Sequence, residues 1–241
     1  MRRYAIVLSG GSGKRLGGEI PKQYIPIKDR MIIEYVLDTL CNVKNLYGVA
    51  VVAAEEWKET VKEAVMPYSG EKKIQFVFAT PGENRQLSIY NGLLALKELG
   101  ASEEDIVLIQ DAARPNTAPG TIEDCFLKCE REGFDGAVPV LPMKDTVYLS
   151  NDGKRISSLI DRRTLFAGQA PEAFCYGAYL RANEALLSPA SGEMSARILS
   201  INGSSEPAFL FGMNVAMIPG DEGNYKITTI ADLERFRTEN E

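Results

Sequence analysis

The 241-residue sequence contains no histidine and only four cysteines. A zinc site would therefore need all four thiolates, and no two of them form a CxxC pair. Reduced and mostly buried thiols, as in cytoplasmic proteins, are the simpler interpretation. Any catalysis by this chain must also proceed without an imidazole group.

Long hydrophobic runs and an excess of positive charge are absent too. No apolar stretch approaches the roughly 18 residues of a membrane span. The basic start MRR precedes only about five apolar residues, too few for a signal peptide. The formal net charge is −6, whereas nucleic-acid-coating proteins are usually basic. We expect a cytoplasmic protein that binds neither membranes nor nucleic acid, although a local cationic pocket for a phosphorylated ligand remains compatible with this charge.

Short apolar runs rich in β-branched residues alternate with helical patterns along the first half of the chain. The predicted strands are 4–8, 48–54, 74–79, 105–110 and 136–140, and the predicted helices between them are 32–40, 55–66, 85–99 and 118–132. Continuous apolar runs are typical of parallel strands that are buried on both faces. The alternating order therefore predicts a Rossmann-like α/β fold, with a mostly parallel twisted sheet and helices on both faces.

The alternation of strands and helices ends after Val140. Residues 144–162 alternate around the sequence NDG, a hairpin turn signal, and predict a β-hairpin arm outside the main sheet. A helix at 176–187, an irregular stretch at 188–206, a strand near Ala216 and a helix from Ile230 complete the chain. Because no linker or repeat is present, we predict one domain, residues 1–241, with the arm at 144–162.

The sequence GGSGKRLGGEIPKQY follows the first predicted strand. Open α/β sheets bind ligands at this edge, and glycines let backbone N–H groups converge on phosphate. A P-loop does not match, because Leu8 replaces its first glycine and Arg15 follows Lys14. A dinucleotide fingerprint fails at Leu16, its third glycine position. From local sequence alone, a glycine-rich turn with solvated cations remains an alternative to a phosphate-binding loop.

Together with GENRQLSIYNGL, IQDAARP, PMKDTVY, LIDR and NYKITTIADL, this loop resembles the 2-C-methyl-D-erythritol 4-phosphate cytidylyltransferases and the related ribitol-5-phosphate cytidylyltransferases. The motifs occur in the family's order over nearly the whole chain. The resemblance implies transfer of CMP from CTP to a polyol phosphate, with release of pyrophosphate. It favours 2-C-methyl-D-erythritol 4-phosphate, in isoprenoid precursor synthesis. Ribitol 5-phosphate as acceptor, a nucleotide-sugar pyrophosphorylase and a nucleotide-binding regulator without turnover are the alternatives.

The proposed chemistry suits a chain without histidine. The attacking phosphate oxygen is already anionic, so the main requirement is stabilisation of negative charge by cations, backbone donors and Mg²⁺. By resemblance, the catalytic cations are Arg15, Lys22 and Lys226. The same resemblance assigns nucleotide binding to Ser9, Gly10, Gly11, Gly13, Lys14, Gly82, Glu83, Ser88 and Ala112.

Two of these motifs have alternative local interpretations. Glu83 and Asn84 could cap a helix, whereas an acceptor near the cytosine amino group would select C over U. The resemblance places Glu83, where the family usually has aspartate, and Ser88 beside the base. Asp111 is a hard oxygen ligand suited to Mg²⁺ on the triphosphate. Arg114 is expected either to bind the acceptor or to form a structural ion pair.

By resemblance, Thr146 contacts a phosphate or hydroxyl group of the acceptor, and Arg162 binds the acceptor phosphate. The sequence departs from the family on this side: Ala170-Pro171-Glu172 replaces TPQ, Gly223 replaces an aspartate, and GEMSA stands where TDDAS is usual. Gln110 also replaces a histidine before Asp111. Cytidylyl transfer is therefore the stronger inference, and the identity of the acceptor is the weaker one.

The predicted arm carries the apolar residues Val147, Leu149, Ile156, Leu159 and Ile160. An isolated hairpin is marginally stable in water, so these side chains need a partner surface. The arm could fold back onto its own domain. The resemblance implies instead that it crosses to a second subunit of a two-fold homodimer, where Arg162 would reach the neighbour's acceptor site.

Overall fold

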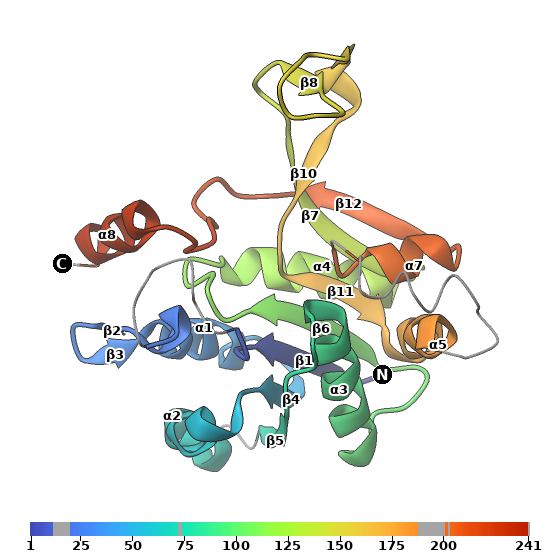
Figure 1. Ribbon diagram of the computed structural model, residues 1–241. Coiled ribbons are helices and arrows are strands. Elements are labelled where there is room, and N and C mark those ends of the chain that lie inside the picture. Colours follow the sequence, from blue (N-terminus) through green and yellow to red (C-terminus); the bar gives the residue numbers. More distant parts are fainter. Residues whose placement is uncertain (12–19, 72–73, 188–200, 202, 241) are drawn as a thin grey trace.

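The computed structural model describes residues 1–11, 20–71, 74–187, 201 and 203–240. It contains an eight-stranded mixed sheet in the order β10-β7-β11-β6-β1-β4-β5, with β12 paired to β7 (Figure 1). The strands are β1 Arg3–Leu8, β4 Leu46–Val52, β5 Gln75–Ala79, β6 Ile106–Asp111, β7 Gly136–Pro142, β10 Phe166–Gly168, β11 Glu172–Cys175 and β12 Val215–Pro219. All five strands predicted in the first half of the chain are present, and the prediction of a mostly parallel sheet is confirmed.

The sheet also contains two short strands that the sequence did not reveal. β11 lies between β6 and β7 and is antiparallel to both. β10 follows the arm and is antiparallel to β7, whereas β12 is parallel to it. The predicted fourth and fifth strands are therefore separated by a strand from later in the chain. Strands of three or four residues give too little periodicity to be detected in a sequence.

Helices cover both faces of the sheet (Figure 1). The helices of the described chain are α1 Ile32–Cys41, α2 Lys58–Glu71, α3 Arg85–Glu98, α4 Pro119–Arg131, α5 Tyr176–Leu187, α7 Glu206–Leu210 and α8 Ile230–Glu239. Alternate residues of β1 point to opposite faces: Ala5 and Val7 join the core under α1, α2 and α4, and Tyr4 and Ile6 join the core under α3 and α5. Each strand thus contributes to two cores, which explains why its sequence is apolar throughout.

The prediction that the second helix ends at Met66 is wrong. A 3-10 turn at Glu55–Trp57 precedes α2, which continues past Pro67 to Glu71. Pro67 is exposed, so its missing N–H leaves a helix carbonyl that water can reach. Tyr68 packs against the core, and its hydroxyl lies 3.3 Å from Asp38 Oδ1. This anchoring favours continuation of the helix beyond the proline.

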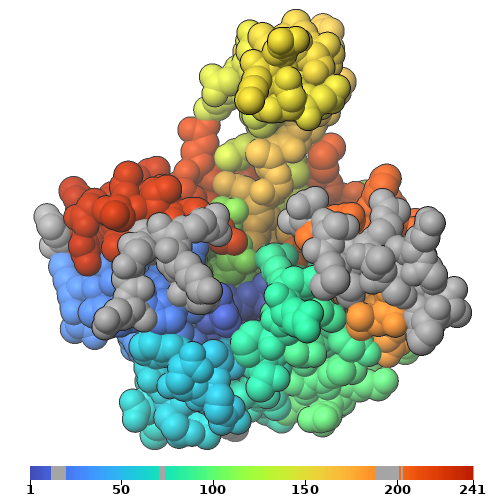
Figure 2. Space-filling model, viewed as in Figure 1, coloured from blue at the N-terminus to red at the C-terminus, as the bar shows by residue number. Residues whose placement is uncertain are grey.

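The predicted arm is a β-hairpin of β8 Val147–Leu149 and β9 Ser158–Ile160, reached from β7 and left through β10. It stands clear of the body in the ribbon and space-filling views (Figures 1 and 2). Its apolar side chains are largely exposed in this single chain, including Tyr148, Leu149, Ile156 and Leu159. The alternative in which the arm folds back onto its own domain is therefore wrong.

After β12 the chain crosses the carboxyl edge of the sheet and ends in α8. This helix packs on α1 and on the small hairpin formed by β2 Pro26–Ile27 and β3 Arg30–Met31. Ile227, which is fully buried, joins Ile27, Ile32 and Phe236 in this contact. The C-terminal segment is thereby fixed beside the first loop. Among the described residues, no helix is long and apolar enough to cross a membrane.

Candidate active site

A cavity of about 520 Å³ lies at the carboxyl ends of β1 and β6. Its wall combines the first loop, the loop before α3, the end of β6 and the segment before α8. Of the residues singled out from the sequence, the wall includes Gly10, Gly11, Lys22, Gly82, Glu83, Ser88, Asp111 and Lys226. Gly13, Lys14 and Arg15 lie outside the described residues. The predicted site therefore assembles, within the described chain, from segments far apart in the sequence.

Hydrogen bonds fix the described parts of the first loop, which lie on either side of residues 12–19. Ser9 is buried, and both its N–H and its hydroxyl donate to the Val52 carbonyl, at 2.9 and 2.8 Å. The Gln23 amide donates to the carbonyl oxygens of Ser9 and Gly11, the latter at 2.8 Å. Ser9 is thus a support for the loop and lies off the cavity wall. Gln23 lines the wall, and the quoted sequence PKQ was the signal that could have identified it.

Close packing explains two of the glycines. A Cβ at Gly10 would lie 2.5 Å from Pro81 Cβ, and one at Gly82 would lie 2.3 Å from Leu87 Cβ. Both distances are far inside van der Waals contact. The first loop can therefore approach the loop before α3 only because Gly10 has no side chain, and that loop can pack on the first turn of α3 only because Gly82 has none.

Helix α3 begins beside the cavity, and its start is held by local hydrogen bonds. Asn84 Oδ1 accepts from the Leu87 amide at 2.8 Å, so the capping interpretation is confirmed for Asn84. Ser88 Oγ accepts from the Gly82 amide at 3.0 Å and donates to the Asn84 carbonyl at 2.8 Å. Glu83 is not the cap, and its exposed side chain lines the cavity. This separates Asn84, which holds the helix, from Glu83, which is free to face a ligand.

Asp111, the last residue of β6, is surrounded by cations. Its carboxylate lies 2.9 Å from Lys226 Nζ, 3.2 Å from Arg85 Nη2 and 3.6 Å from Arg114 Nε. Burial by itself would raise the pKa of this carboxyl, but the neighbouring cations outweigh burial and hold the pKa well below its usual range. Asp111 is therefore ionised, and the surplus of positive charge suits a polyphosphate. Sequence reasoning missed Arg85, although it stands within the quoted GENR.

Asp111 is also the residue expected to hold Mg²⁺. The described residues contain no cluster of three acidic, cysteine or histidine side chains that could bind a metal by themselves. Mg²⁺ bound to a nucleotide usually needs only one or two carboxylates, because phosphate and water oxygens complete its shell. A single ionised carboxylate on the cavity wall fits that mode of binding.

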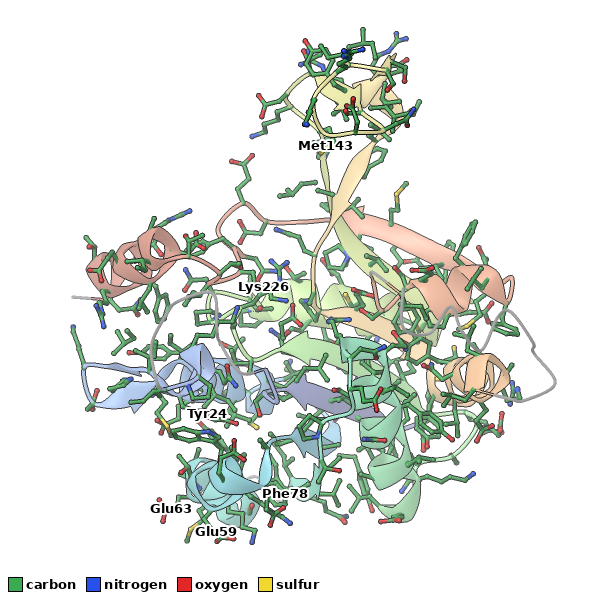
Figure 3. All side chains as sticks on the ribbon, in the orientation of Figure 1. Tyr24, Glu59, Glu63, Phe78, Met143 and Lys226 are labelled. Carbon is green, nitrogen blue, oxygen red and sulfur yellow. The ribbon has the colours of Figure 1, made fainter. Side chains whose placement is uncertain are left out.

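Lys22 reaches the cavity from a 3-10 turn, Lys22–Tyr24, that follows Pro21. The Tyr24 amide donates to the Pro21 carbonyl at 2.9 Å and closes this turn. Lys22 Nζ donates to the Ile227 carbonyl at 2.5 Å. Lys226 comes from the C-terminal segment and is labelled at the centre of Figure 3. The two ends of the chain thus bring both expected lysines to one cavity.

Two predicted residues near Asp111 lie off the cavity wall. Ala112 is 1% exposed, and its amide donates to the Leu8 carbonyl at 3.1 Å, so Ala113 takes its place on the wall. Arg114 Nη1 donates to the Asn224 carbonyl at 2.5 Å while Nε faces Asp111. Arg114 therefore forms the ion pair that one interpretation expected, and its role in binding the acceptor stays a prediction.

Thr146 and Arg162 lie on the arm and not at this cavity. With Leu159, Ile160 and Asp161 they line a separate hollow of about 440 Å³. Arg162 Nη1 donates to the Lys144 carbonyl at the base of the hairpin. Within a single chain, the two residues expected at the acceptor are therefore separated from the cationic cavity.

Two of the residues that depart from the family pattern, Ala170 and Glu172, lie at the junction of β10 and β11, whereas Gly223 lies in the segment before α8. The departure GEMSA, residues 192–196, lies outside the described residues. The Ala170 carbonyl accepts from Asn224 Nδ2 at 2.7 Å. Glu172 is buried and does not line the cavity. Burial raises the pKa of its carboxyl, and the opposing charge of Arg85 offsets only part of this increase. The departures at Ala170 and Glu172 thus lie among the residues behind the cavity and not on its wall.

Comparison with known proteins agrees with this geometry. Residues 4–238 match the family model of 2-C-methyl-D-erythritol 4-phosphate cytidylyltransferase. The chain is 34% identical to the protein of that name from Syntrophotalea carbinolica, over 97% of this chain and 94% of the relative. It is 30% identical to a ribitol-5-phosphate cytidylyltransferase from Lacticaseibacillus paracasei, over 97% and 95%.

Solved structures agree at the level of the fold. The 2-C-methyl-D-erythritol 4-phosphate cytidylyltransferase of Francisella tularensis superimposes with a TM-score of 0.79 at 21% identity, covering 99% of this chain and 100% of that one. The 4-diphosphocytidyl-2C-methyl-D-erythritol synthase of Anaerococcus prevotii gives 0.78, covering 99% and 96%. Since the family model spans nearly the whole sequence, the chain belongs to the 2-C-methyl-D-erythritol 4-phosphate cytidylyltransferase family of nucleotidyltransferases.

Proposed function

We propose that this chain transfers CMP from CTP to 2-C-methyl-D-erythritol 4-phosphate and releases pyrophosphate, a step of isoprenoid precursor synthesis. The observation that carries the proposal is a cavity in which Lys226 and Arg85 contact one ionised carboxylate and Lys22 lines the same wall, in a chain that matches this family from residue 4 to 238. An excess of fixed positive charge at the edge of a parallel sheet suits a nucleoside triphosphate.

The reaction needs no proton to be removed from the nucleophile. An anionic oxygen of the acceptor phosphate forms a bond to the α-phosphorus of CTP, and the bond from that phosphorus to the bridging oxygen breaks. Pyrophosphate leaves with the electron pair of that bond. Lys22 and Lys226 stabilise the negative charge that spreads over the phosphoryl oxygens, and the ordered loops provide backbone donors without reorganisation.

The nucleotide is proposed to lie along the first loop, with its base near the start of α3. Glu83 would accept a hydrogen bond from the amino group of cytosine, which uracil lacks. The hydrogen bonds of Ser88 to Gly82 and Asn84 hold this loop in place. A divalent cation, Mg²⁺, would be held by Asp111 and would neutralise charge on the triphosphate.

The acceptor half of the site is proposed to come from a second subunit. In one chain, Thr146 and Arg162 lie on an arm that stands clear of the body and exposes apolar side chains. A two-fold dimer would cover these side chains and could bring both residues to the partner's cavity, since such a contact is reciprocal. This arrangement would complete each active site with residues from both chains.

Ribitol 5-phosphate is the second candidate acceptor. A ribitol-5-phosphate cytidylyltransferase is 30% identical to this chain, within the 29% to 34% of the methylerythritol phosphate enzymes compared with it. The departures at Ala170 and Glu172 lie beside the supports of the site. Both candidates use the same nucleotide chemistry and differ in the alcohol that is recognised.

A pyrophosphate-release assay separates these possibilities. Purified protein is given each of the four nucleoside triphosphates with Mg²⁺ and with methylerythritol phosphate, ribitol 5-phosphate or a sugar 1-phosphate. The proposal expects release with CTP and methylerythritol phosphate. A preference for ribitol 5-phosphate would select the second candidate, and activity with UTP and a sugar 1-phosphate would overturn cytidylyl transfer. The Lys22→Ala protein, prepared in the same way, controls for contaminating enzymes.

A further inference from the structure

The segment between β12 and α8 carries Lys226 but has no regular secondary structure of its own from 220 to 228. Its position therefore depends on side-chain contacts. Asn224 is the most deeply buried polar residue of this segment, with 1% of its surface exposed. Its Nδ2 donates to the Ala170 carbonyl at 2.7 Å, and its Oδ1 accepts from Thr117 Oγ1 at 3.1 Å. One side chain thus links the segment to the turn before β11 and to the loop after β6.

The backbone of Asn224 is anchored as well. Its amide donates to the Asp221 carbonyl at 3.1 Å, and its carbonyl accepts from Arg114 at 2.5 Å and from Gln169 Nε2 at 3.4 Å. The side chain of Gln169 also binds the backbone of Asp221: Nε2 donates to the Asp221 carbonyl at 2.9 Å, and Oε1 accepts from the Asp221 backbone N–H at 3.0 Å. Buried polar groups satisfied on all sides specify one geometry strongly, because any shift would leave several of them without partners.

Two catalytic lysines depend on where this segment lies. Two residues beyond Asn224, Lys226 Nζ meets Asp111 at 2.9 Å. The next residue, Ile227, is fully buried, and its amide donates to the Ala113 carbonyl at 2.9 Å. Its carbonyl accepts from Lys22 Nζ at 2.5 Å. Asn224 and Ile227 therefore hold the segment on both sides of Lys226, and only Asn224 does so through hydrogen bonds of its side chain.

We infer that Asn224 is a positioning residue for phosphoryl transfer: it fixes the register of the segment that places Lys226 against Asp111 and offers the Ile227 carbonyl to Lys22. This inference rests on the proposed function for its effect on turnover. Asn224 itself does not line the cavity, so it acts through the lysines. Errors of about 1 Å in the placement of a catalytic group can cost about a hundredfold in rate.

A double-mutant cycle tests this coupling. Asn224→Ala should lower kcat at least about tenfold while changing the KM for CTP less than about threefold. In the Lys226→Ala background, the same substitution should cost less than about threefold, because the lysine it positions is already gone. Losses that multiply fully in the double variant would overturn the inference, since they would show that Asn224 acts independently of Lys226.

Asn116→Ala is the matched control. Asn116 lies in the same loop after β6 and donates to Glu239 Oε2 at 3.0 Å, away from the cavity wall. Its replacement should leave kcat within about twofold of the wild type. If Asn224→Ala does not fold, Thr117→Val enters the same cycle, because it removes the hydroxyl that donates to Asn224 Oδ1. A multiplicative loss for Thr117→Val would count against the inference in the same way.

A crystal structure of the variant used in the cycle gives a test that does not depend on turnover. The inference expects Lys226 Nζ to leave its position 2.9 Å from Asp111 Oδ2. An unchanged ion pair in the variant would overturn it. Wild-type pyrophosphate release with CTP tests the proposed function separately, so an inactive wild type combined with a displaced lysine would reject the function and keep the positioning role.

Discussion

Lys226 Nζ lies 2.9 Å from Asp111 Oδ2, and the same oxygen faces Arg114 Nε at 3.6 Å. Arg85 contacts the other carboxylate oxygen at 3.2 Å. One carboxylate thus contacts three cations, two of which, Arg85 and Lys226, line the cavity proposed to receive a triphosphate. A triphosphate with Mg²⁺ would compete with these ion pairs. Its oxygens would bind the cations, and its metal ion would bind Asp111. This exchange makes Asp111 the natural point at which to test metal dependence.

Asp111→Asn should remove the dependence of CTP binding on Mg²⁺. The amide keeps the shape but is a weak ligand for a hard cation, and it leaves more positive charge to attract the bare triphosphate. We expect kcat to fall by about two orders of magnitude or more. Titration calorimetry with CTP, with and without Mg²⁺, checks the binding. If Mg²⁺ increased the affinity for CTP equally in the wild type and the variant, Asp111 would be rejected as the metal ligand.

Lys22→Ala should lower kcat by about two or more orders of magnitude, with a much smaller effect on the affinity for CTP. The reason is that its charge is needed most when the transition state and the leaving group gain negative charge. Steady-state kinetics of pyrophosphate release and a direct CTP titration measure the two effects. Lys97→Ala, an exposed change at the far end of α3, is the control. Near-normal kcat for Lys22→Ala would contradict the assignment of the first loop.

Gly82→Ala should destabilise the protein by about 1–3 kcal/mol, because the added methyl overlaps a packed helix start. Its Cβ would lie 2.3 Å from Leu87 Cβ and 2.8 Å from the Leu87 carbonyl carbon. Gly120→Ala is the matched control, since no atom lies within 4 Å of a Cβ at Gly120. Chemical denaturation compares the two free energies of unfolding. Equal free energies of unfolding for the two variants would show that the loop before α3 accommodates the added methyl group at little cost.

Glu172→Gln should alter the pH dependence of stability. Burial raises the pKa of Glu172 in the folded protein, with Arg85 opposing in part. From about pH 4.3, where an unfolded glutamate loses its proton, up to the raised pKa, the folded chain holds a proton that the unfolded chain releases. The free energy of unfolding therefore falls as the pH rises through this window, and glutamine removes that loss.

Melting temperatures across the pH range measure this effect. The melting temperature of Glu172→Gln minus that of the wild type should increase as the pH rises above about 4.3. Glu98→Gln makes the same chemical change at an exposed position and should follow the wild type. A constant difference between Glu172→Gln and wild type at every pH would show that the buried carboxyl keeps its ordinary pKa on folding.

The proposed dimer makes two measurable predictions. Light scattering should give a mass of about 53 kDa, twice the 26.5 kDa of the chain, because the arm needs a partner surface. Mixing inactive Lys22→Ala with inactive Arg162→Ala should restore activity after subunit exchange, since each mixed dimer would contain one intact shared site. A fully active monomer would exclude a site shared between chains.

The sequence by itself determined the strands and helices of the parallel part and the position of the ligand edge. Continuous apolar runs such as YAIVL can be buried on both faces only in a covered sheet, so the layers followed from local pattern. The motif residues Lys22, Asp111 and Lys226 were also found by sequence, and the structure brings all three to one cavity. The two lysines were assigned through the resemblance to the family, whose motifs can be read in a linear chain, and Asp111 through the preference of Mg²⁺ for oxygen ligands.

Tertiary structure alone decided how these residues are held. β11 is inserted between β6 and β7 by pairing with distant strands, which no local pattern encodes. Arg114 turned out to support Asp111, and Asn224 was revealed only by partners from two other segments, Ala170 and Thr117. Hydrogen bonds of this kind satisfy buried groups across long sequence separations, so their geometry exists only once the chain has folded.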